Sequence, residues 1–378
     1  MKEMTVRNPL LALRKAGQSV WLDYIHRNLL QSGELRRLVE EDGLSGVTSN
    51  PTIFEKAISE SPDYDASFAR LRSKRASVTE AYETLVAEDI TAACDILRPV
   101  FDQTGGADGF VSVEVSPLLA HDADGTVREV RQWFERIGRP NLMVKIPGTP
   151  EGVPAIEAMI AEGVNINVTL IFAVERYVKV VESFLSGLEK LRAKGGDLAR
   201  VHSVASFFVS RVDTKVDDQL TTRMRAADPD RSRVIESLFG HAAVANSKLA
   251  YEMFTQLHSG PRWDALSQAG ATVQRPLWAS TSTKNPRYRD TMYVEELIGP
   301  ATVNTMPPAT FEAFREHGRV ELTLQRDIEG ARRVLQQLAV IGIDLAAITQ
   351  ELEDEGVAGF AKSYRESIEN LARAASRS

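Results

Sequence analysis

The sequence predicts an α/β fold, a (β/α)8 TIM barrel with additional helices at the N-terminus, in a helical insertion and at the C-terminus. Eight apolar, strand-like runs alternate with helical patterns along 378 residues, which is typical of a parallel α/β fold. Barrels of this kind span about 250 to 400 residues. The alternative, a doubly wound sheet, usually carries a glycine-rich phosphate loop after its first strand, and WLDYIHRN contains no such loop.

The predicted strands are the short apolar runs that end at turn residues. They comprise residues 19–25, 44–50, 109–116, 141–146, 164–172, 201–207, 276–281 and 302–306. Helical periodicity predicts helices at residues 33–41, 62–103 with a break near 73–77, 125–137, 151–162, 174–194, 209–224, 232–257, 288–297, 308–317 and 328–341. We expect one domain over residues 1–378, with a helical insertion around 226–270. The last helix, around 345–375, is expected to be interrupted at Gly356 and Gly359, because glycine is unfavourable inside helices.

Composition argues against several classes of protein. The net charge of −7 and the pI near 5.6 disfavour a nucleic-acid partner, because such binding neutralises phosphates with Lys and Arg. No run approaches the roughly 20 apolar residues of a membrane span, and the N-terminus lacks the apolar stretch of a signal peptide. Cys94 is the one cysteine, and no HExxH pattern occurs, so neither a disulfide nor a zinc site is expected. A cytoplasmic protein without metal, membrane or nucleic-acid partners is predicted.

Polar side chains recur where the predicted strands end. Every second residue of a strand lies on the same face, so the polar positions of one strand share a face while its valines point the other way. The set comprises Asp23, Thr48, Asn50, Glu114, Lys145, Asn167, Thr169 and Ser206. In a barrel this face points inward at the carboxyl ends of the strands, where barrel enzymes carry their catalytic groups.

Each of these residues alone has a simpler interpretation. An Asp, Ser or Thr at a strand end is more often a helix cap or a turn residue, and Asn50 before Pro51 is a turn signal. Lys145 could be a solvated strand end, and Glu114 could lie at the barrel rim. The repetition of one kind of position on successive strands favours an active site.

Lys145 is the most unusual of these residues, because it lies in the apolar run NLMVKIP. Lysine is almost never fully buried unless it is paired. Burial disfavours an ammonium and frees an amine, which attacks carbonyl carbons to form a Schiff base. Forming and breaking the Schiff base requires proton transfer, which the carboxyls of Glu114 and Asp23 can supply. The neighbouring amides and hydroxyls suit the hydroxyl groups of a polyol.

A phosphate site is predicted at the later strands. Arg211 follows Ser206 by five residues, at the start of a predicted helix. The loop WASTSTKNPRYR places Ser280 and Lys284 after the seventh strand, and hydroxyls with a lysine suit a phosphate. Late loops of barrels often bind this group. An ordinary basic surface loop is the alternative at this point.

Several of these segments together resemble the transaldolase family. VTSNPTIF is similar to the family's segment after the second strand, and VKIPGTPEG is similar to the segment that carries its Schiff-base lysine. SVEVSP, INVTLIF and SFFVSRVD are similar to its third, fifth and sixth strand ends. The long insertions and the VNTMPPATFEAF segment resemble the longer bacterial branch of the family.

The resemblance implies a cofactor-independent class I aldolase barrel of the non-oxidative pentose phosphate pathway. It implies transfer of a dihydroxyacetone unit from sedoheptulose 7-phosphate to glyceraldehyde 3-phosphate, giving erythrose 4-phosphate and fructose 6-phosphate. Lys145 would form the Schiff base. Glu114 would act as acid and base through a water held by Thr169, and Asp23 would move the proton during carbon–carbon cleavage. The implied substrate-binding residues are Thr48, Asn50, Asn167, Ser206, Phe208, Arg211, Ser280 and Lys284.

Two other functions remain open from the sequence. Fructose 6-phosphate aldolases, which release free dihydroxyacetone, resemble a shorter barrel that tends to lack a carboxylate at the position of Glu114 and to carry tyrosine at that of Phe208. A non-catalytic barrel that binds sugar phosphates is the other alternative, and it has no need of a buried lysine.

Shorter transaldolases place an arginine near Ser282, and Lys284 is chosen in its place by chemistry and proximity. Monomer and homodimer are not distinguished.

Overall fold

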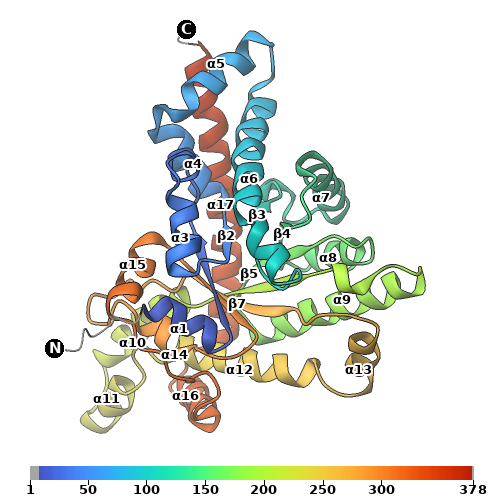
Figure 1. Cartoon of the computed structure of the whole chain (residues 1–378). Helices are drawn as coiled ribbons and strands as arrows, with labels where there is room; N and C mark the ends of the chain where they lie inside the picture. Colours follow the sequence, from blue (N-terminus) through green and yellow to red (C-terminus); the bar gives the residue numbers. More distant parts are fainter. Residues whose placement is uncertain (1–7, 377–378) are drawn as a thin grey trace, which may run out of the picture.

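Eight parallel strands close into a barrel in the computed structural model, which describes residues 8–376 (Figure 1). Each strand pairs with its neighbours in chain order, and β8 returns to β1. The strands are β1 (Gln18–Asp23), β2 (Gly46–Thr48), β3 (Phe110–Glu114), β4 (Leu142–Pro147), β5 (Ile166–Ile171), β6 (Ser203–Phe208), β7 (Arg275–Ala279) and β8 (Thr302–Met306). The predicted TIM barrel is therefore confirmed, and the doubly wound alternative is wrong. That residues 1–378 form one domain stays a prediction, and residues 1–7 and 377–378 lie outside the described part.

The helices surround this barrel (Figure 1). They are α1 (Pro9–Lys15), α2 (Arg27–Gln31), α3 (Glu34–Asp42), α4 (Pro51–Glu60), α5 (Asp65–Ser73), α6 (Val78–Gln103), α7 (Ala123–Ile137), α8 (Gly152–Ile160), α9 (Val174–Ala193), α10 (Ser210–Met224), α11 (Pro229–Glu236), α12 (Ala242–Leu257), α13 (Pro261–Gln268), α14 (Met292–Glu296), α15 (Pro308–His317), α16 (Ile328–Val340) and α17 (Leu345–Ser376). Short 3-10 turns lie at Pro62–Tyr64, Pro117–Leu119 and Leu198–Arg200.

Several helical segments differ from the sequence prediction. The segment expected as one helix at 232–257 forms α11 and α12, separated by a turn in which Gly240 has a φ of +74°. Helices α2, α4 and α13 were not predicted. The start of α4 carries a signal that was interpreted as a turn: Asn50 caps the helix by accepting from the Ile53 N–H, and Pro51 occupies its first position, both of which are typical of a helix N-terminus.

The C-terminal helix α17 is continuous, so the predicted interruption at its glycines is wrong. It runs beside α4 and α6 (Figure 1), and Ser363 shares a hydrogen bond of 2.8 Å with Thr52 of α4. Gly356 is buried against the barrel. A Cβ at this position would lie only 2.8 Å from Leu170 Cδ2 at the end of β5. The absence of a side chain thus brings α17 close to the barrel, a use of glycine that depends on tertiary packing.

The two glycines of α17 should respond oppositely to alanine. Gly359 is exposed with no atom within 4 Å of its Cβ position, so Gly359→Ala should raise the free energy of unfolding by about 0.5–1 kcal/mol through helix propensity. Gly356→Ala should lose this gain, because its methyl group must displace Leu170. Thermal denaturation of both variants checks the difference, and a higher Tm for Gly356→Ala than for Gly359→Ala would contradict it.

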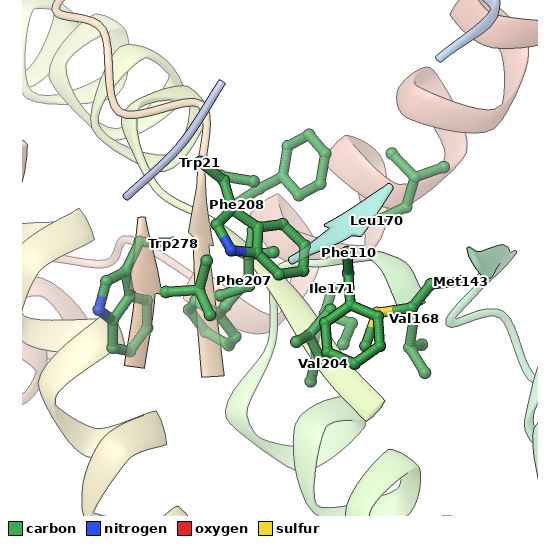
Figure 2. Packing of buried hydrophobic residues seen from close by; sticks show 14 of the residues in the cluster. Trp21, Phe110, Met143, Val168, Leu170, Ile171, Val204, Phe207, Phe208 and Trp278 are labelled. Carbon is green, nitrogen blue, oxygen red and sulfur yellow. The ribbon is translucent and has the colours of Figure 1, made fainter. Parts of the chain in front are cut away.

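The floor beneath the carboxyl ends of the strands is apolar. Trp21, Phe110 and Met143 lie at even spacings before polar strand ends on β1, β3 and β4, and all three are buried (Figure 2). The Trp21 and Phe110 rings pack with centroids 6.3 Å apart. A Cβ at Gly46 would lie 2.4 Å from the Trp21 indole, so this glycine makes room for the ring. The barrel interior therefore has a layer of packed apolar side chains beneath a layer of polar side chains at the carboxyl ends of the strands, an arrangement typical of layered barrel cores.

Candidate active site

Lys145 and Glu114 form a buried pair at the carboxyl ends of β4 and β3. They are register partners in the parallel ladder, and Lys145 Nζ lies 3.4 Å from Glu114 Oε2. Their exposed fractions are 4% and 9%. The ammonium also donates to the Ser49 carbonyl at 3.0 Å. The strand alternation seen in the sequence therefore directs both side chains into the barrel, as predicted.

Burial controls the protonation of Glu114. Desolvation raises the pKa of this carboxyl to about 7, against the opposing effect of the Lys145 charge. Neither of its oxygens has a hydrogen-bond partner within residues 8–376. A carboxyl with a pKa near neutrality can both give and take a proton at physiological pH, which is the property of a general acid and base.

Asp23, at the end of β1, is the second carboxyl of the site. Its Oδ1 accepts a hydrogen bond of 2.6 Å from the Thr48 hydroxyl, which lies 2.7 Å from that of Thr305. Burial raises the pKa of Asp23, while the Lys145 charge and the Thr48 hydrogen bond lower it. Thr48 therefore orients the carboxyl by a direct contact.

Thr169 lies next to a strained residue on β5. Leu170 has a φ of +59°, and the register of β5 against β6 shifts between Val168 and Ile171. A left-handed conformation is costly for a residue with a side chain and tends to occur at functional sites. The buried Thr169 hydroxyl has no hydrogen-bond partner in the described part of the chain, which leaves it available to a water or a substrate.

Asn167 and Ser206 belong to a chain of hydrogen bonds across β3, β5 and β6. Asn167 Nδ2 donates to Ser112 Oγ at 3.0 Å, and Ser206 Oγ donates to Asn167 Oδ1 at 2.8 Å. Ser206 also lines a cavity at the mouth of the barrel. Asn50 also lines the cavity while its Oδ1 caps α4, so its place at the helix start does not remove it from the cavity wall.

The predicted phosphate-binding residues Arg211, Ser280 and Lys284 all line the cavity. Arg211 is the second residue of α10, and its guanidinium lies 5.4 Å from the centroid of the Phe208 ring. Burial lowers the pKa of Arg211, and within residues 8–376 it forms no ion pair or hydrogen bond. Ser280 has a φ of +55°, with its hydroxyl 3.1 Å from that of Ser210. Lys284 donates to Ser282 at 2.9 Å.

All of the predicted site residues except Glu114 and Asn167 line a cavity of about 660 Å³ at the barrel mouth. Sequence reasoning missed part of its wall, namely Tyr24, His26, Lys56, Thr305 and Phe360. Thr305 ends the eighth strand and could have been found by the same rule as the other polar strand ends. Phe360 comes from α17, and no local pattern in the sequence places that helix over the mouth.

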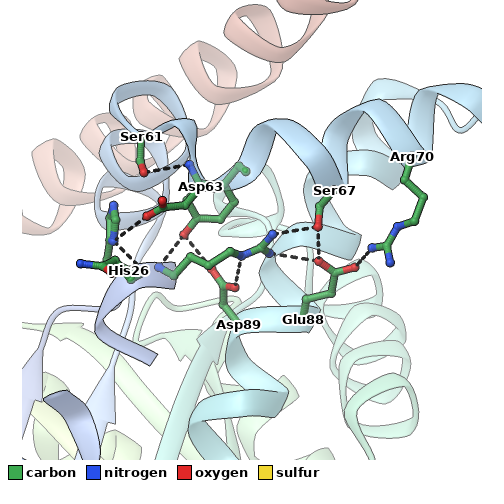
Figure 3. A network of polar contacts seen from close by, with 10 residues as sticks. His26, Ser61, Asp63, Ser67, Arg70, Glu88 and Asp89 are labelled. Atoms are coloured by element: carbon green, nitrogen blue, oxygen red, sulfur yellow. Dashed lines mark hydrogen bonds and ion pairs between the residues drawn. The ribbon is translucent and has the colours of Figure 1, made fainter. Parts of the chain in front are cut away.

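A buried polar network supports the segment that follows Asp23 in the chain and forms part of the cavity wall (Figure 3). Arg27 of α2 pairs with Asp89 of α6 at 2.9 Å and with Glu88 at 3.0 Å. The Tyr64 hydroxyl donates to Asp89 at 2.7 Å. His26, beside this network, packs edge-on against the Tyr64 ring. The network fixes α2 against α6 and thereby the position of His26.

Residues 8–376 contain neither a cluster of metal ligands nor a helix suited to a membrane. No three His, Cys, Asp or Glu side chains gather there in a way that could hold a metal ion. No helix in this part of the chain is both long and apolar enough to cross a membrane.

Comparison with known proteins identifies the family. The family model described as transaldolase/fructose-6-phosphate aldolase matches residues 20–371. The chain belongs to this family. A transaldolase of Thermobifida fusca (strain YX) is 47% identical over 367 residues, 97% of this chain and 98% of the relative. Transaldolases of Parafrankia sp. (strain EAN1pec), 48% identical over 96% of this chain and 97% of the relative, and of Trichodesmium erythraeum (strain IMS101), 44% identical over 97% of both chains, are further relatives.

Proposed function

We propose that this member of the transaldolase family is itself a transaldolase. It transfers a dihydroxyacetone unit from sedoheptulose 7-phosphate to glyceraldehyde 3-phosphate, giving erythrose 4-phosphate and fructose 6-phosphate in the non-oxidative pentose phosphate pathway. The observation that carries the proposal is the Lys145 amine, which lines a cavity together with Asp23 and Arg211 and lies 3.4 Å from the buried Glu114 carboxyl. A cytoplasmic location, and a monomer or homodimer, remain predictions.

The first step is attack of the Lys145 amine on C2 of the donor ketose. Addition gives a carbinolamine, and loss of its hydroxyl as water gives the Schiff base. Glu114 supplies the proton to the departing hydroxyl, through a water held by the free hydroxyl of Thr169. With its pKa raised to about 7, Glu114 exchanges protons readily at neutral pH, so it can supply this proton and recover it later.

Carbon–carbon cleavage follows from the protonated Schiff base. Asp23 takes the proton from the C4 hydroxyl, the C3–C4 bond breaks, and its electrons move into an enamine on Lys145. Erythrose 4-phosphate leaves. The enamine then adds to the aldehyde carbon of glyceraldehyde 3-phosphate, and Asp23 returns its proton to the new alkoxide. Water added back to the Schiff base releases fructose 6-phosphate, so atoms and charge balance over the cycle.

The remaining residues of the cavity bind and orient the sugar. Asn50 and Ser206 bind hydroxyls near the Schiff base, Asn167 holds Ser206, and Thr48 orients Asp23. At the other end, the Arg211 guanidinium binds the phosphate together with Ser280 and Lys284. Planar guanidinium groups suit phosphate because they donate two parallel hydrogen bonds.

Release of free dihydroxyacetone is the competing activity within the family. The enamine must then be protonated at C3, and water must hydrolyse the resulting Schiff base, before an acceptor arrives; the Phe208 ring offers no hydroxyl that could activate a water. We therefore expect fructose 6-phosphate to be consumed rapidly only when erythrose 4-phosphate is present as acceptor. A coupled assay for glyceraldehyde 3-phosphate, with and without the acceptor, tests this. Equal rates in both conditions would assign the chain to the aldolases.

A further inference from the structure

A buried carboxylate of α10 anchors the segment that follows the predicted phosphate loop. Asp217 Oδ1 accepts the Gly240 N–H at 3.1 Å, and its Oδ2 accepts the hydroxyl of Tyr288. The Tyr288 ring packs on Gly240, where a Cβ would lie 2.8 Å from Tyr288 Cζ. Gly240 also has a φ of +74°, so both its conformation and the ring contact require glycine.

One helical turn earlier, Asp213 makes the same kind of contact. Its Oδ1 accepts the Ala243 N–H at 2.7 Å, and its Oδ2 accepts the Tyr293 hydroxyl at 2.9 Å. Residues four apart share a helix face, so α10 presents two carboxylates to the start of the α12 region and to the chain after β7. Neither carboxylate pairs with a lysine or arginine within residues 8–376. Their contacts with backbone N–H groups and tyrosine hydroxyls are therefore the ones that compensate their burial.

These contacts connect the two chain segments that carry the predicted phosphate-binding cations. Arg211 lies two residues before Asp213 on α10, and Lys284 lies four residues before Tyr288. The near end of the loop is fixed by the Ser210 N–H, which donates to the Ser280 carbonyl at 3.0 Å. Tyr288 fixes the far end. The loop that carries Lys284 is thus attached at both ends to the helix that carries Arg211.

We propose that Tyr288 is a positioning residue for phosphorylated substrates, which holds the segment 280–288 on α10 so that Lys284 and Arg211 face the same end of the cavity. Tyr288 does not line the cavity itself, so it acts through Lys284. The inference rests on the proposed function, in which these two cations bind the substrate phosphate. It also gives the helical insertion a role, because Gly240 receives the Tyr288 ring.

The test compares a phosphorylated acceptor with its unphosphorylated form. With saturating fructose 6-phosphate as donor, Tyr288→Phe should raise KM for erythrose 4-phosphate by about 3–10-fold, the loss expected for one hydrogen bond. KM for erythrose and kcat should stay near their wild-type values. Tyr293→Phe is the matched control, because it removes an equivalent hydroxyl nine residues from Lys284. It should lower Tm while leaving the ratio of the two KM values unchanged.

Lys284→Ala supplies the reference for the phosphate effect. It should raise KM for erythrose 4-phosphate selectively, and adding Tyr288→Phe to it should cause no further selective rise, because the tyrosine acts through the lysine. An equal rise for both acceptors in Tyr288→Phe, no rise, or a selective effect in Tyr293→Phe would overturn the positioning role. If Lys284→Ala shows no selectivity, the phosphate assignment itself fails and the inference fails with it, whereas the acceptor-dependence assay above still decides the proposed function.

Discussion

Lys145→Met is expected to reduce transaldolase activity by roughly 10⁴–10⁶-fold, the loss typical of removing a covalent nucleophile. Methionine fills a similar volume but cannot form a Schiff base. The direct measurement is reduction with borohydride in the presence of fructose 6-phosphate, followed by mass spectrometry of the peptides. Wild-type protein should carry the reduced adduct on Lys145, and the variant should carry none.

Folding should survive this substitution. In the wild type the Lys145 charge lowers the pKa of Glu114, so removing the charge lets that carboxyl stay protonated, and a neutral carboxyl needs no counter-charge. Lys248→Met is the matched control, because Lys248 is also mostly buried and donates to the Arg326 carbonyl outside the cavity. It should keep both activity and adduct. An adduct on a lysine other than Lys145 would refute the assignment of the nucleophile.

Glu114→Gln should reduce kcat by roughly 10²–10⁴-fold, the usual contribution of a general acid and base. The amide keeps the shape of the side chain but cannot transfer the proton between water and the carbinolamine. Schiff-base formation should become the slow step, so the rate of borohydride trapping should fall in parallel. Single-turnover trapping measures this directly. Unchanged kcat would remove Glu114 from the mechanism.

The same substitution should change how stability depends on pH. The folded protein holds the Glu114 proton up to a pKa of about 7, whereas the unfolded chain loses it near 4.5. Between these values the unfolded chain binds fewer protons, so the wild-type free energy of unfolding falls as pH rises, by on the order of 3 kcal/mol in total. Glu114→Gln lacks this loss. Its Tm relative to wild type should therefore increase from pH 5 to pH 8.

Besides burial, the charge of Asp23 contributes to the raised pKa of Glu114, and Asp23 itself is unchanged in the variant. Glu353→Gln provides a control for loss of a buried carboxyl elsewhere. Glu353 pairs with Arg176 at a distance of 3.2 Å, and neither of these residues lines the cavity that contains Lys145. It should keep kcat near the wild-type value. A relative Tm of Glu114→Gln that falls with increasing pH would contradict the inferred protonation of Glu114.

The barrel could be predicted from sequence because its signals are local. Each strand is a short apolar run with its own turn residues, and β8 was predicted with the bounds that the structure gives it. The continuity of α17 could not be predicted, because Gly356 is tolerated through its contact with Leu170, a residue more than 180 positions earlier in the chain. The separation of α11 from α12 likewise depends on the contact between Gly240 and Tyr288.

The candidate site likewise contains residues that could be predicted from the sequence and contacts that could not. Lys145, Glu114 and Asp23 could be predicted as a group, since period-two alternation and the common direction of parallel strands bring their side chains together. Which hydroxyl contacts which carboxyl could not, because the pairing of Thr48 with Asp23 depends on the stagger of β1 against β2. The strain at Leu170 and the wall residue Phe360 have no sequence signal at all. Their roles, like those of the other site residues, await the measurements above.

The placement of Phe360 on the cavity wall has a consequence for biosynthesis. Ribosomes make the chain from its N-terminus, so Lys145, the proposed nucleophile, is synthesised before β8, which pairs with β1, and before α17, which supplies Phe360 to the cavity wall. A nascent chain that ends before α17 lacks this part of the wall. The cavity is therefore completed only when α17 has been translated and has docked.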